Sequence, residues 1–473
     1  MLCGIDDTCA EEARRILTLC CFSERPLRVS ELIDAIAVNL DEPVGLDQES
    51  RLQDSDSLLE ICPGLIILER GADDTNEYLI SQTGSGSALG TFSSEFSEKE
   101  DAIINNEPPD GQAGMDMTVR IAHFSVKEYL ESGRIKETKA AAFALSRTAA
   151  HTKIAQLCCA YLLEPSLSNK LYKFPFAKYA ANHWDHHYQN AMSETPELKT
   201  FVRRIFTQYE SFYIWAECME SRFLPHVEDL NEVDIGYPLY YASILGLDWL
   251  LGELLATKMK ARRVNARGGY YGSALTAASV GGYEKAVRIL IDAGAEDVEG
   301  NFNEFGDALE AASYYGYTNI VDLLLDRGAE TNTPKNRLGN ALRAACHQGH
   351  EKIVQRLLDA GADANYEGDG FAYSMEPAIH LAAEGRHVKI VEMLLSAGAD
   401  PNIRGMFKGS ALEVAARVGH EKLVRVLLGA GADPNILGTS KHGALKVAAQ
   451  GGHEKIVRML LDAGAESKDE ALE

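Results

Sequence analysis

The chain has 473 residues, of which 46% are hydrophobic and 25% charged, a composition typical of globular domains rather than of disordered or fibrous chains. Its net charge is −24, and residues 1–235, with 39 acidic and 21 basic residues, carry −18 of it. Because phosphate groups repel an acidic surface, nucleic acid and anionic membranes are excluded as the main partners of that half.

The cysteines and the N-terminal segment indicate the compartment. None of the nine cysteines form a CxxC pair, and two adjacent pairs, Cys20–Cys21 and Cys158–Cys159, lie in apolar helical runs, which predicts reduced, buried thiols. The first 15 residues have no basic start followed by an apolar core, and no run of 18 apolar residues occurs. We therefore expect a cytoplasmic protein, with the nucleus as the alternative.

The first predicted elements belong to an α+β module over residues 1–136. Two helices are expected, the second over Glu31–Val38 with Ser30 as its N-cap. A strand is expected over Leu65–Leu68, and "TVRIAHF" (118–124) is expected to pair with "GLIILE" or "EYLI" and to run into a helix. Residues 81–118, rich in Ser, Gly, Asp and Glu, predict a disordered insertion between the strands. This element order indicates a winged-helix arrangement.

Residues 137–235 are predicted to form a helical linker domain. Within it, "HWDHH" places His183, His186 and His187 on one helix face with Asp185 nearby, a spacing that zinc could use. A zinc site also needs ligands from a second segment, and no second Cys/His cluster offers them. We therefore expect no metal, and Trp184 is predicted to be a core anchor.

Residues 236–473 contain internal repeats. Six segments align, such as "NALRAACHQGHEKIVQRLLDAGAD" and "SALEVAARVGHEKLVRVLLGAGAD", and a degenerate one begins at Tyr237. Each combines a short Ala-rich helix, a Gly turn, a longer helix with an apolar stripe and a terminating glycine. One such unit cannot bury its apolar face alone, so about seven units should stack into an α-solenoid. The Gly-Ala pairs that end the six units start at Gly294, Gly328, Gly361, Gly398, Gly431 and Gly464.

These repeats resemble the ankyrin family. The usual Thr-Pro-Leu-His opening is replaced, for example by Ser273–Thr276, Asp307–Glu310 and Asn340–Arg343, and only His380 keeps the histidine. The resemblance implies no enzyme activity and a protein ligand bound along the concave face. By position, the expected binding residues include one residue from each of six inner helices, here called the stripe: Val280, Tyr314, His347, Glu384, Arg417 and Gln450. Arg343, on the same helix as His347, is also expected to bind. The turn tips are expected to add Tyr270, Tyr271, Phe302, Phe305, Phe371, Tyr373, Met406 and Phe407. The alternative is that several tip aromatics fold back onto their own repeat.

The first half resembles the winged-helix segment of fungal NOD-like receptors, through "FSERPLRVSELIDAIAV", "ICPGLIILE" and "IAHFSVKEYLESG". Such receptors carry a P-loop, GxxxxGK[ST], in a preceding ATPase domain, and this chain has no such motif and opens about ten residues before the winged helix. The resemblance makes His123 a candidate vestigial nucleotide sensor, with burial in the strand as the alternative. The expected unit is one part of a switch whose ATPase is missing from this chain.

The sequence gives little support for catalysis or for DNA binding. Cys346 and His347 are neighbours on a helix, so their side chains diverge by about 100° and cannot pair for catalysis. The second helix of the winged helix carries Glu31 and Asp34 and no basic residue, whereas helices that read the DNA major groove carry Arg, Lys, Asn or Gln. We therefore expect no catalytic residues, no cofactor and no DNA binding.

The sequence as a whole predicts a mainly α protein: an ankyrin solenoid preceded by a winged-helix-like module and a helical linker. The main hypothesis is a non-enzymatic interaction protein, derived from a NOD-like receptor and concerned with intracellular recognition or regulation. The alternatives are a fragment of a nucleotide-driven signalling switch and a general ankyrin scaffold. The last repeat ends in "DAGAESKDEALE" without a distinctly polar closing unit, so three alternatives stay open: the acidic tail suffices for solubility, the array dimerises, or the chain is truncated.

Overall fold

The computed structural model describes residues 2–41, 44–70, 117–169, 173–191, 195–223, 236–256, 264–296, 307–327, 337–367, 376–405, 409–436 and 443–466. The chain divides into two compact units, Met1–Arg222 and Phe223–Glu473. No helix within the described ranges is long and apolar enough to cross a membrane.

The first unit begins with the winged-helix module. A three-stranded antiparallel sheet has the order β1-β5-β4, formed by Leu27–Arg28, Met117–Ile121 and Ile66–Arg70, and β5 leads into α5 (Phe124–Glu131). Val119 lies opposite both Leu27 and Leu68 and is buried. The remaining elements are α1 (Ala10–Phe22), α2 (Val29–Ile36), α3 (Ser55–Ile61) and a small hairpin of β2 (Val38–Asn39) and β3 (Gly45–Leu46).

The predicted pairing of "TVRIAHF" with "GLIILE" is confirmed by this register, whereas "EYLI" lies outside the described residues. Met117 and Thr118 belong to β5, so the predicted insertion extended two residues too far; residues 81–116 lie outside the described part of the chain. The predicted start of the second helix was also wrong. The helix begins at Val29 because the Glu31 carboxylate reaches back to accept the backbone N–H of Arg28 at 2.8 Å.

Four longer helices complete the first unit: α6 (Arg147–Leu162), α7 (Phe176–Gln189), α8 (Pro196–Thr207) and α9 (Tyr209–Phe223). Trp184 on α7 is fully buried and packs edge-to-face on Trp215 of α9, which confirms its prediction as a core anchor. Short 3-10 turns lie at Leu2–Gly4, Asp7–Cys9, Gly133–Glu137, Ala141–Phe143 and Pro165–Asn169.

Buried polar contacts join the winged helix to these helices. The hydroxyl of Tyr161 on α6 donates to Asp34 Oδ2 on α2 at 2.5 Å, and Arg51 lies 2.7 Å from Asp34 Oδ1. The Glu164 carboxylate accepts the backbone N–H of Leu46 at 2.9 Å. The module and the helices that follow it therefore form one compact unit.

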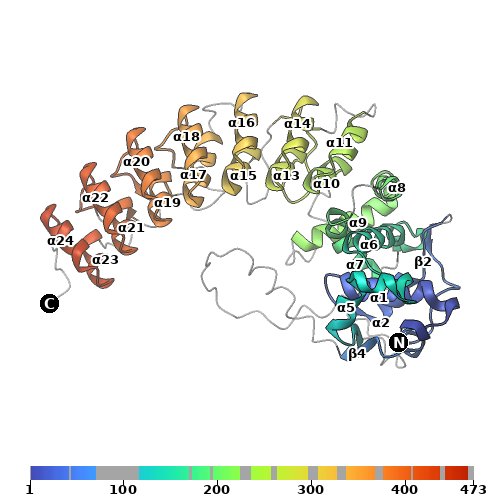
Figure 1. The fold of residues 1–473 in the computed structure, drawn as a ribbon. Helices are drawn as coiled ribbons and strands as arrows, with labels where there is room; N and C mark the ends of the chain where they lie inside the picture. The colour runs from blue at the N-terminus through green and yellow to red at the C-terminus, as the bar shows by residue number, and fades with distance from the viewer. Residues whose placement is uncertain are drawn as a thin grey trace. The chain divides into compact units, whose positions relative to one another are not determined.

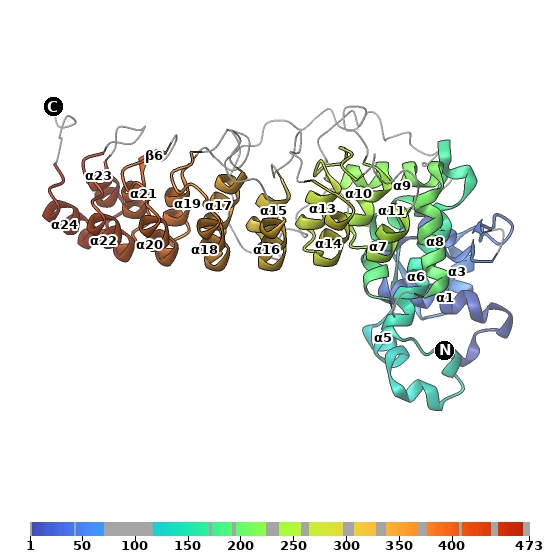
Figure 2. The same ribbon diagram turned by 90° about the horizontal axis from the view of Figure 1, so that it is seen from above.

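The second unit is a row of helix pairs. In each pair an inner helix is followed by an outer helix; inner helices pack on inner helices and outer helices on outer helices, which gives the two rows of Figures 1 and 2. The described part of the chain contains seven pairs, as predicted, and an added hairpin of β6 (Arg404–Gly405) and β7 (Gly409–Ser410). The pairs are α10 (Pro238–Ile244) with α11 (Asp248–Leu255), α13 (Ala274–Val280) with α14 (Glu284–Asp292), α15 (Ala308–Tyr315) with α16 (Thr318–Asp326), α17 (Arg337–Gln348) with α18 (Glu351–Asp359), α19 (Ala378–Glu384) with α20 (Val388–Ser396), α21 (Ala411–Arg417) with α22 (Glu421–Gly429), and α23 (Ala444–Gln450) with α24 (Glu454–Asp462).

Two recurring contacts lock successive repeats together. An asparagine of one loop bridges to the next: the Asn402 side chain donates to Gly431 O at 3.2 Å and accepts the N–H of Asp433 at 2.8 Å, and Asn365 and Asn435 do the same one repeat earlier and later. The aromatic or histidine side chain at the N-cap of an outer helix packs against a glycine of the preceding repeat, as the His387 ring packs against Gly349. These contacts fix the stacking that positions the inner helices side by side.

Candidate protein-binding face

The predicted stripe lies near the C-terminal ends of the inner helices. In five repeats the residue directly before the stripe position is fully buried (Ser279, Ser313, Cys346, Ala383, Ala416). The stripe residues themselves are half-buried or exposed: Val280, Tyr314, His347 and Glu384 are half-buried, and Arg417 and Gln450 are exposed. The stripe position is therefore accessible to solvent in all six repeats, and the residue type at that position differs from repeat to repeat.

Aromatic rings gather at two adjacent stripe positions. Tyr314 and His347 stack with centroids 6.5 Å apart and planes 16° apart, which brings together two predicted residues from neighbouring repeats. Tyr315, missed by the sequence reasoning, is 40% exposed beside Tyr314 and stacks on Tyr317. The adjacent pair Tyr314-Tyr315 could have indicated the exposure of Tyr315, since an inner helix that ends in two aromatic residues cannot bury both.

The predicted turn tips have mixed outcomes. Tyr270 is half-buried, but Tyr271 is only 8% exposed, so its prediction as an exposed tip was wrong. The Tyr271 backbone N–H donates to the Tyr240 hydroxyl at 3.1 Å, and the Tyr240 ring packs beneath Gly269, which draws the loop inward. Phe302, Phe305, Phe371, Tyr373, Met406 and Phe407 lie outside the described residues.

Arg343 was predicted to belong to the binding face, and it does not. It is 5% exposed, and its guanidinium donates to Glu376 O at 2.9 Å and to Asn340 Oδ1 at 3.0 Å. Glu376 and His380, both buried, pair at 3.2 Å in the next repeat. These two acceptors offset part of the cost of burying the guanidinium. Arg343 therefore joins two repeats rather than meeting a ligand.

The altered repeat openings still cap their helices. Side-chain oxygens of Ser273, Asp307 and Ser410 accept the backbone N–H three residues further on, at 2.8–3.2 Å. The replacement of Thr-Pro-Leu-His therefore changes the chemistry of the cap while a side-chain cap is kept in these three repeats.

His123 is exposed, so the alternative of burial in the strand was wrong. It is the N-cap of α5: its Nδ1 accepts the backbone N–H of Ser125 at 3.2 Å and lies 2.8 Å from the Ser125 hydroxyl. This capping accounts for the residue without a ligand, and its role as a nucleotide sensor stays a prediction.

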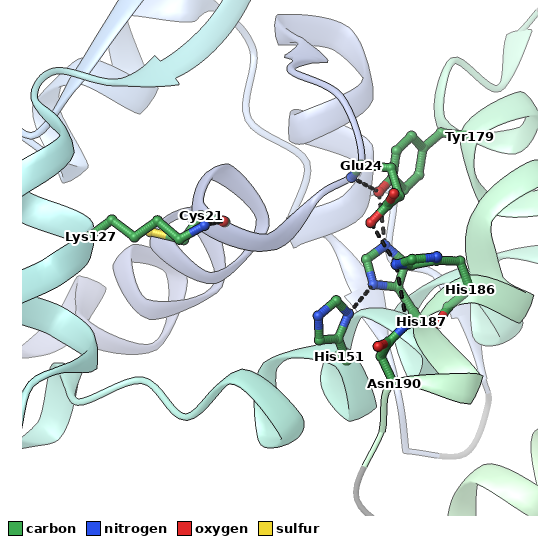
Figure 3. A network of polar contacts seen from close by, with 8 residues as sticks. All are labelled: Cys21, Glu24, Lys127, His151, Tyr179, His186, His187 and Asn190. Carbon is green, nitrogen blue, oxygen red and sulfur yellow. Dashed lines mark hydrogen bonds and ion pairs between the residues drawn. The ribbon is translucent and has the colours of Figure 1, made fainter. Parts of the chain in front are cut away.

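The histidines of "HWDHH" face different partners. His187 is buried, with Nδ1 2.8 Å from Nδ1 of His151 on α6 and Nε2 2.9 Å from the Tyr179 hydroxyl, whereas His186 pairs with Glu24 at 2.7 Å (Figure 3). Among the described residues, no three His, Cys, Asp or Glu side chains are grouped so that they could hold a metal ion. His151 was missed because it lies 36 residues before its partner in the sequence.

Two family models match this chain, one in each half. The ankyrin-repeat family matches residues 239–335, 311–405 and 406–471, and the winged helix domain of GPI inositol-deacylase matches residues 1–83. The azaphilone pigments biosynthesis cluster protein L of Monascus ruber is 37% identical over 313 residues, which are 63% of this chain and 58% of that relative's length. The crystal structure of the human ASB11 ankyrin repeat domain, 23% identical, aligns with a TM-score of 0.41 over 49% of this chain and 99% of that domain.

Proposed function

We propose that this chain, an ankyrin-repeat protein with an N-terminal winged-helix domain, is a non-enzymatic interaction protein whose array binds a protein ligand. The observation that carries the proposal is the stripe, in which one position in each of six repeats is half-buried or exposed and in five of them directly follows a fully buried residue. Its residue types (Val, Tyr, His, Glu, Arg, Gln) vary, while the positions before it are Ala, Ser or Cys. Chemical variety confined to one surface line of a regular scaffold supports selective recognition there.

The proposal assigns the first unit a regulatory role and a cytoplasmic location. Support for the regulatory role comes from the winged-helix match over residues 1–83 and from the contact between Tyr161 and Asp34, which joins the winged helix to the helices after it. On this hypothesis the unit derives from a NOD-like receptor. The test is binding of fluorescent ATP to the full chain: no saturable binding is expected, and saturable binding would favour the nucleotide-driven switch.

The array's role is tested with the full chain as bait for affinity capture, followed by Kd measurement on each purified partner. The face variant Y314A/H347A/R417A is compared with the matched variant Q355A/E392A/R425A, whose residues are exposed on the outer helices α18, α20 and α22. We expect a partner whose Kd rises at least tenfold with the face variant and stays unchanged with the control. Partners affected equally by both variants, or by neither, would overturn the proposal, and a broad set of face-dependent partners would favour a general scaffold.

A further inference from the structure

The last described helix pair, α23 with α24, lies at the end of both rows of the array (Figures 1 and 2). In the preceding repeat, Leu412 and Ala416 lie on the inner helix α21, on which α23 packs, and both are fully buried. The residues at the same positions of α23 are more accessible, since Leu445 is half-buried and Ala449 is exposed. The far side of α23 is therefore built like a surface that another helix covers, and no helix within the described ranges covers it.

The outer helices show the same change. On α22, Val424 is fully buried and Leu428 is half-buried. At the equivalent positions of α24, Val457 is half-buried and Leu461 is 50% exposed. Accessible apolar side chains that lie together, bordered by charged residues, are typical of surfaces that bind another protein.

Three exposed charged residues lie on the same side of α24 as these two apolar residues, at helical spacings of three and four: Glu454, Arg458 and Asp462. That side of an outer helix faces the following repeat, because Glu421, the equivalent of Glu454 on α22, pairs with Lys455 on α24 at 3.4 Å. The accessible residues of α23 and α24 together are here called the end face: Leu445, Val447, Ala449, Glu454, Val457, Arg458, Leu461 and Asp462.

The end face is complementary to a second copy of itself. A rotation of 180° about an axis from the inner row to the outer row stacks α23 on the partner's α23 and α24 on the partner's α24, both antiparallel, so that the two rows continue across the contact. Antiparallel packing sets Val457 against the partner's Leu461 and Arg458 beside the partner's Asp462. Residues 236–473 carry only −6 of the net charge of −24, so two arrays repel each other weakly.

We propose that the end face joins two copies of this chain end to end in a symmetric dimer. The contact continues the stacking that already joins one repeat to the next, and the face carries both of the charges that the pairing needs. The inference does not depend on the ligand of the stripe, so its failure would leave the proposed function standing.

Lys446 limits the strength of this contact. It is exposed on α23 at the position of Arg343, whose guanidinium reaches the following repeat through Glu376 O. A symmetric dimer therefore places Lys446 of both copies in one interface, where like charges oppose association. The dimer is expected to be reversible, and Lys446→Leu should tighten it.

Sedimentation equilibrium of the full chain over a series of concentrations tests the dimer. We expect a reversible monomer–dimer equilibrium whose Kd rises about tenfold or more with Leu461→Asp, because the substitution buries a charge at the centre of the contact. The matched control is Arg425→Asp, at an exposed position equivalent to Arg458 one repeat earlier, and it should leave the Kd unchanged. Circular dichroism should show all variants folded. A dimer that is insensitive to Leu461→Asp would overturn the proposal. A chain that is monomeric at every concentration would also overturn it, and would assign the end face to residues 467–473 or to a different protein.

Exchange of charges supplies a readout that misfolding would not move. In Arg458→Asp both positions of the pairing are acidic, and in Asp462→Arg both are basic, so each variant alone should dimerise about tenfold more weakly than the wild type. Mixed in equal amounts, the two variants should form a heterodimer with a Kd near that of the wild type. This complementarity holds for any offset between the two antiparallel α24 helices. The absence of a heterodimer from the two folded variants would overturn the proposal.

Discussion

The Nδ1 atoms of His151 on α6 and His187 on α7 lie 2.8 Å apart in the interior of the first unit. On its other side His187 contacts the Tyr179 hydroxyl, which accepts the backbone N–H of Glu24 at 3.2 Å (Figure 3). A hydrogen bond between two Nδ1 atoms needs one of them unprotonated. The His151–His187 contact therefore joins α6 to α7 only while at least one ring is neutral.

This pair predicts loss of stability in mild acid. Burial lowers the pKa of His187 to about 3 and also lowers the pKa of His151, whereas an unfolded histidine has a pKa of about 6.5. Above pH 6.5 both states are neutral and the contribution is fully present. As the pH falls from 6.5 toward 3, the unfolded state binds more protons, so the free energy of unfolding drops by up to about 1.4 kcal/mol per pH unit through His187, and His151 acts in the same direction.

The measurement is urea unfolding between pH 7.5 and 5, followed by the fluorescence of the buried Trp184 and Trp215 in a Trp249→Phe background. His187→Gln should flatten the pH dependence, since the side chain it introduces does not titrate. His183→Gln, at a half-buried position on the same helix, should leave the slope as in the wild type. An unchanged slope in His187→Gln would show that this pair is not the source of the acid sensitivity.

Tyr161→Phe should loosen the winged helix from the helices behind it. Asp34 is fully buried, and burial raises the pKa of its carboxyl; removing the Tyr161 hydroxyl leaves Oδ2 without that donor. Hydrogen bonds to charged groups contribute about 1.5–3 kcal/mol, and a loss in that range is expected. The control is Tyr213→Phe, because Tyr213 is 45% exposed and should change stability by less than about 0.5 kcal/mol. Equal effects of the two substitutions would contradict this account.

Much of the fold follows from local pattern. The sequence of each repeat predicts its own helices and turn. Ala311 indicates the inner helix, Gly316 the turn and Leu324 the outer helix, without knowledge of the neighbouring repeats. Strands β4 and β5 were equally readable, because "TVRIAHF" and "GLIILE" are strand-like on their own, whereas β1, the β2–β3 hairpin and α3 were not predicted. The stripe residues were found because repeat position alone determines which side of an inner helix they occupy.

The errors in the candidate binding face concern contacts between distant segments. Whether Tyr271 is exposed depends on the Tyr240 ring about one repeat earlier, and whether Arg343 is buried depends on the Glu376 carbonyl one repeat later. The His151–His187 contact joins two helices whose packing no local period reveals. Polar residues were placed on the surface by default, and burial of a polar residue requires partners that the sequence does not identify.

The asparagine bridges predict how the array unfolds. Asn402→Ala removes the bonds to Gly431 O and to the N–H of Asp433, which connect the loops after the fifth and sixth of the seven described repeats. The free energy of unfolding is expected to fall by about 1–2 kcal/mol. The urea unfolding transition should also become broader, because the coupling between repeats weakens. Asn435→Ala removes the same two bonds at the final loop, where only the last repeat can uncouple, and should broaden the transition less. A narrow, wild-type transition in Asn402→Ala would show that helix packing alone carries the coupling.

The ring-on-glycine contact can be isolated with two glycines of similar backbone geometry. Gly349 and Gly361 have φ of 83° and 91°, so alanine strains the backbone similarly at both positions. A Cβ at Gly349 would lie 2.5 Å from Cε1 of His387, whereas a Cβ at Gly361 would meet nothing within 4 Å. Gly349→Ala should therefore destabilise the array by about 1–3 kcal/mol more than Gly361→Ala does.

A double-mutant cycle then assigns the difference. His387→Ala removes the ring that a Cβ at residue 349 would strike, so in that background the costs of Gly349→Ala and Gly361→Ala should converge. His387→Ala has a cost of its own, because the ring also contacts His347 O at 3.3 Å, but the cycle cancels that cost. Additive effects of His387→Ala and Gly349→Ala would mean that the ring yields to the new methyl group and that the glycines are required for their φ alone.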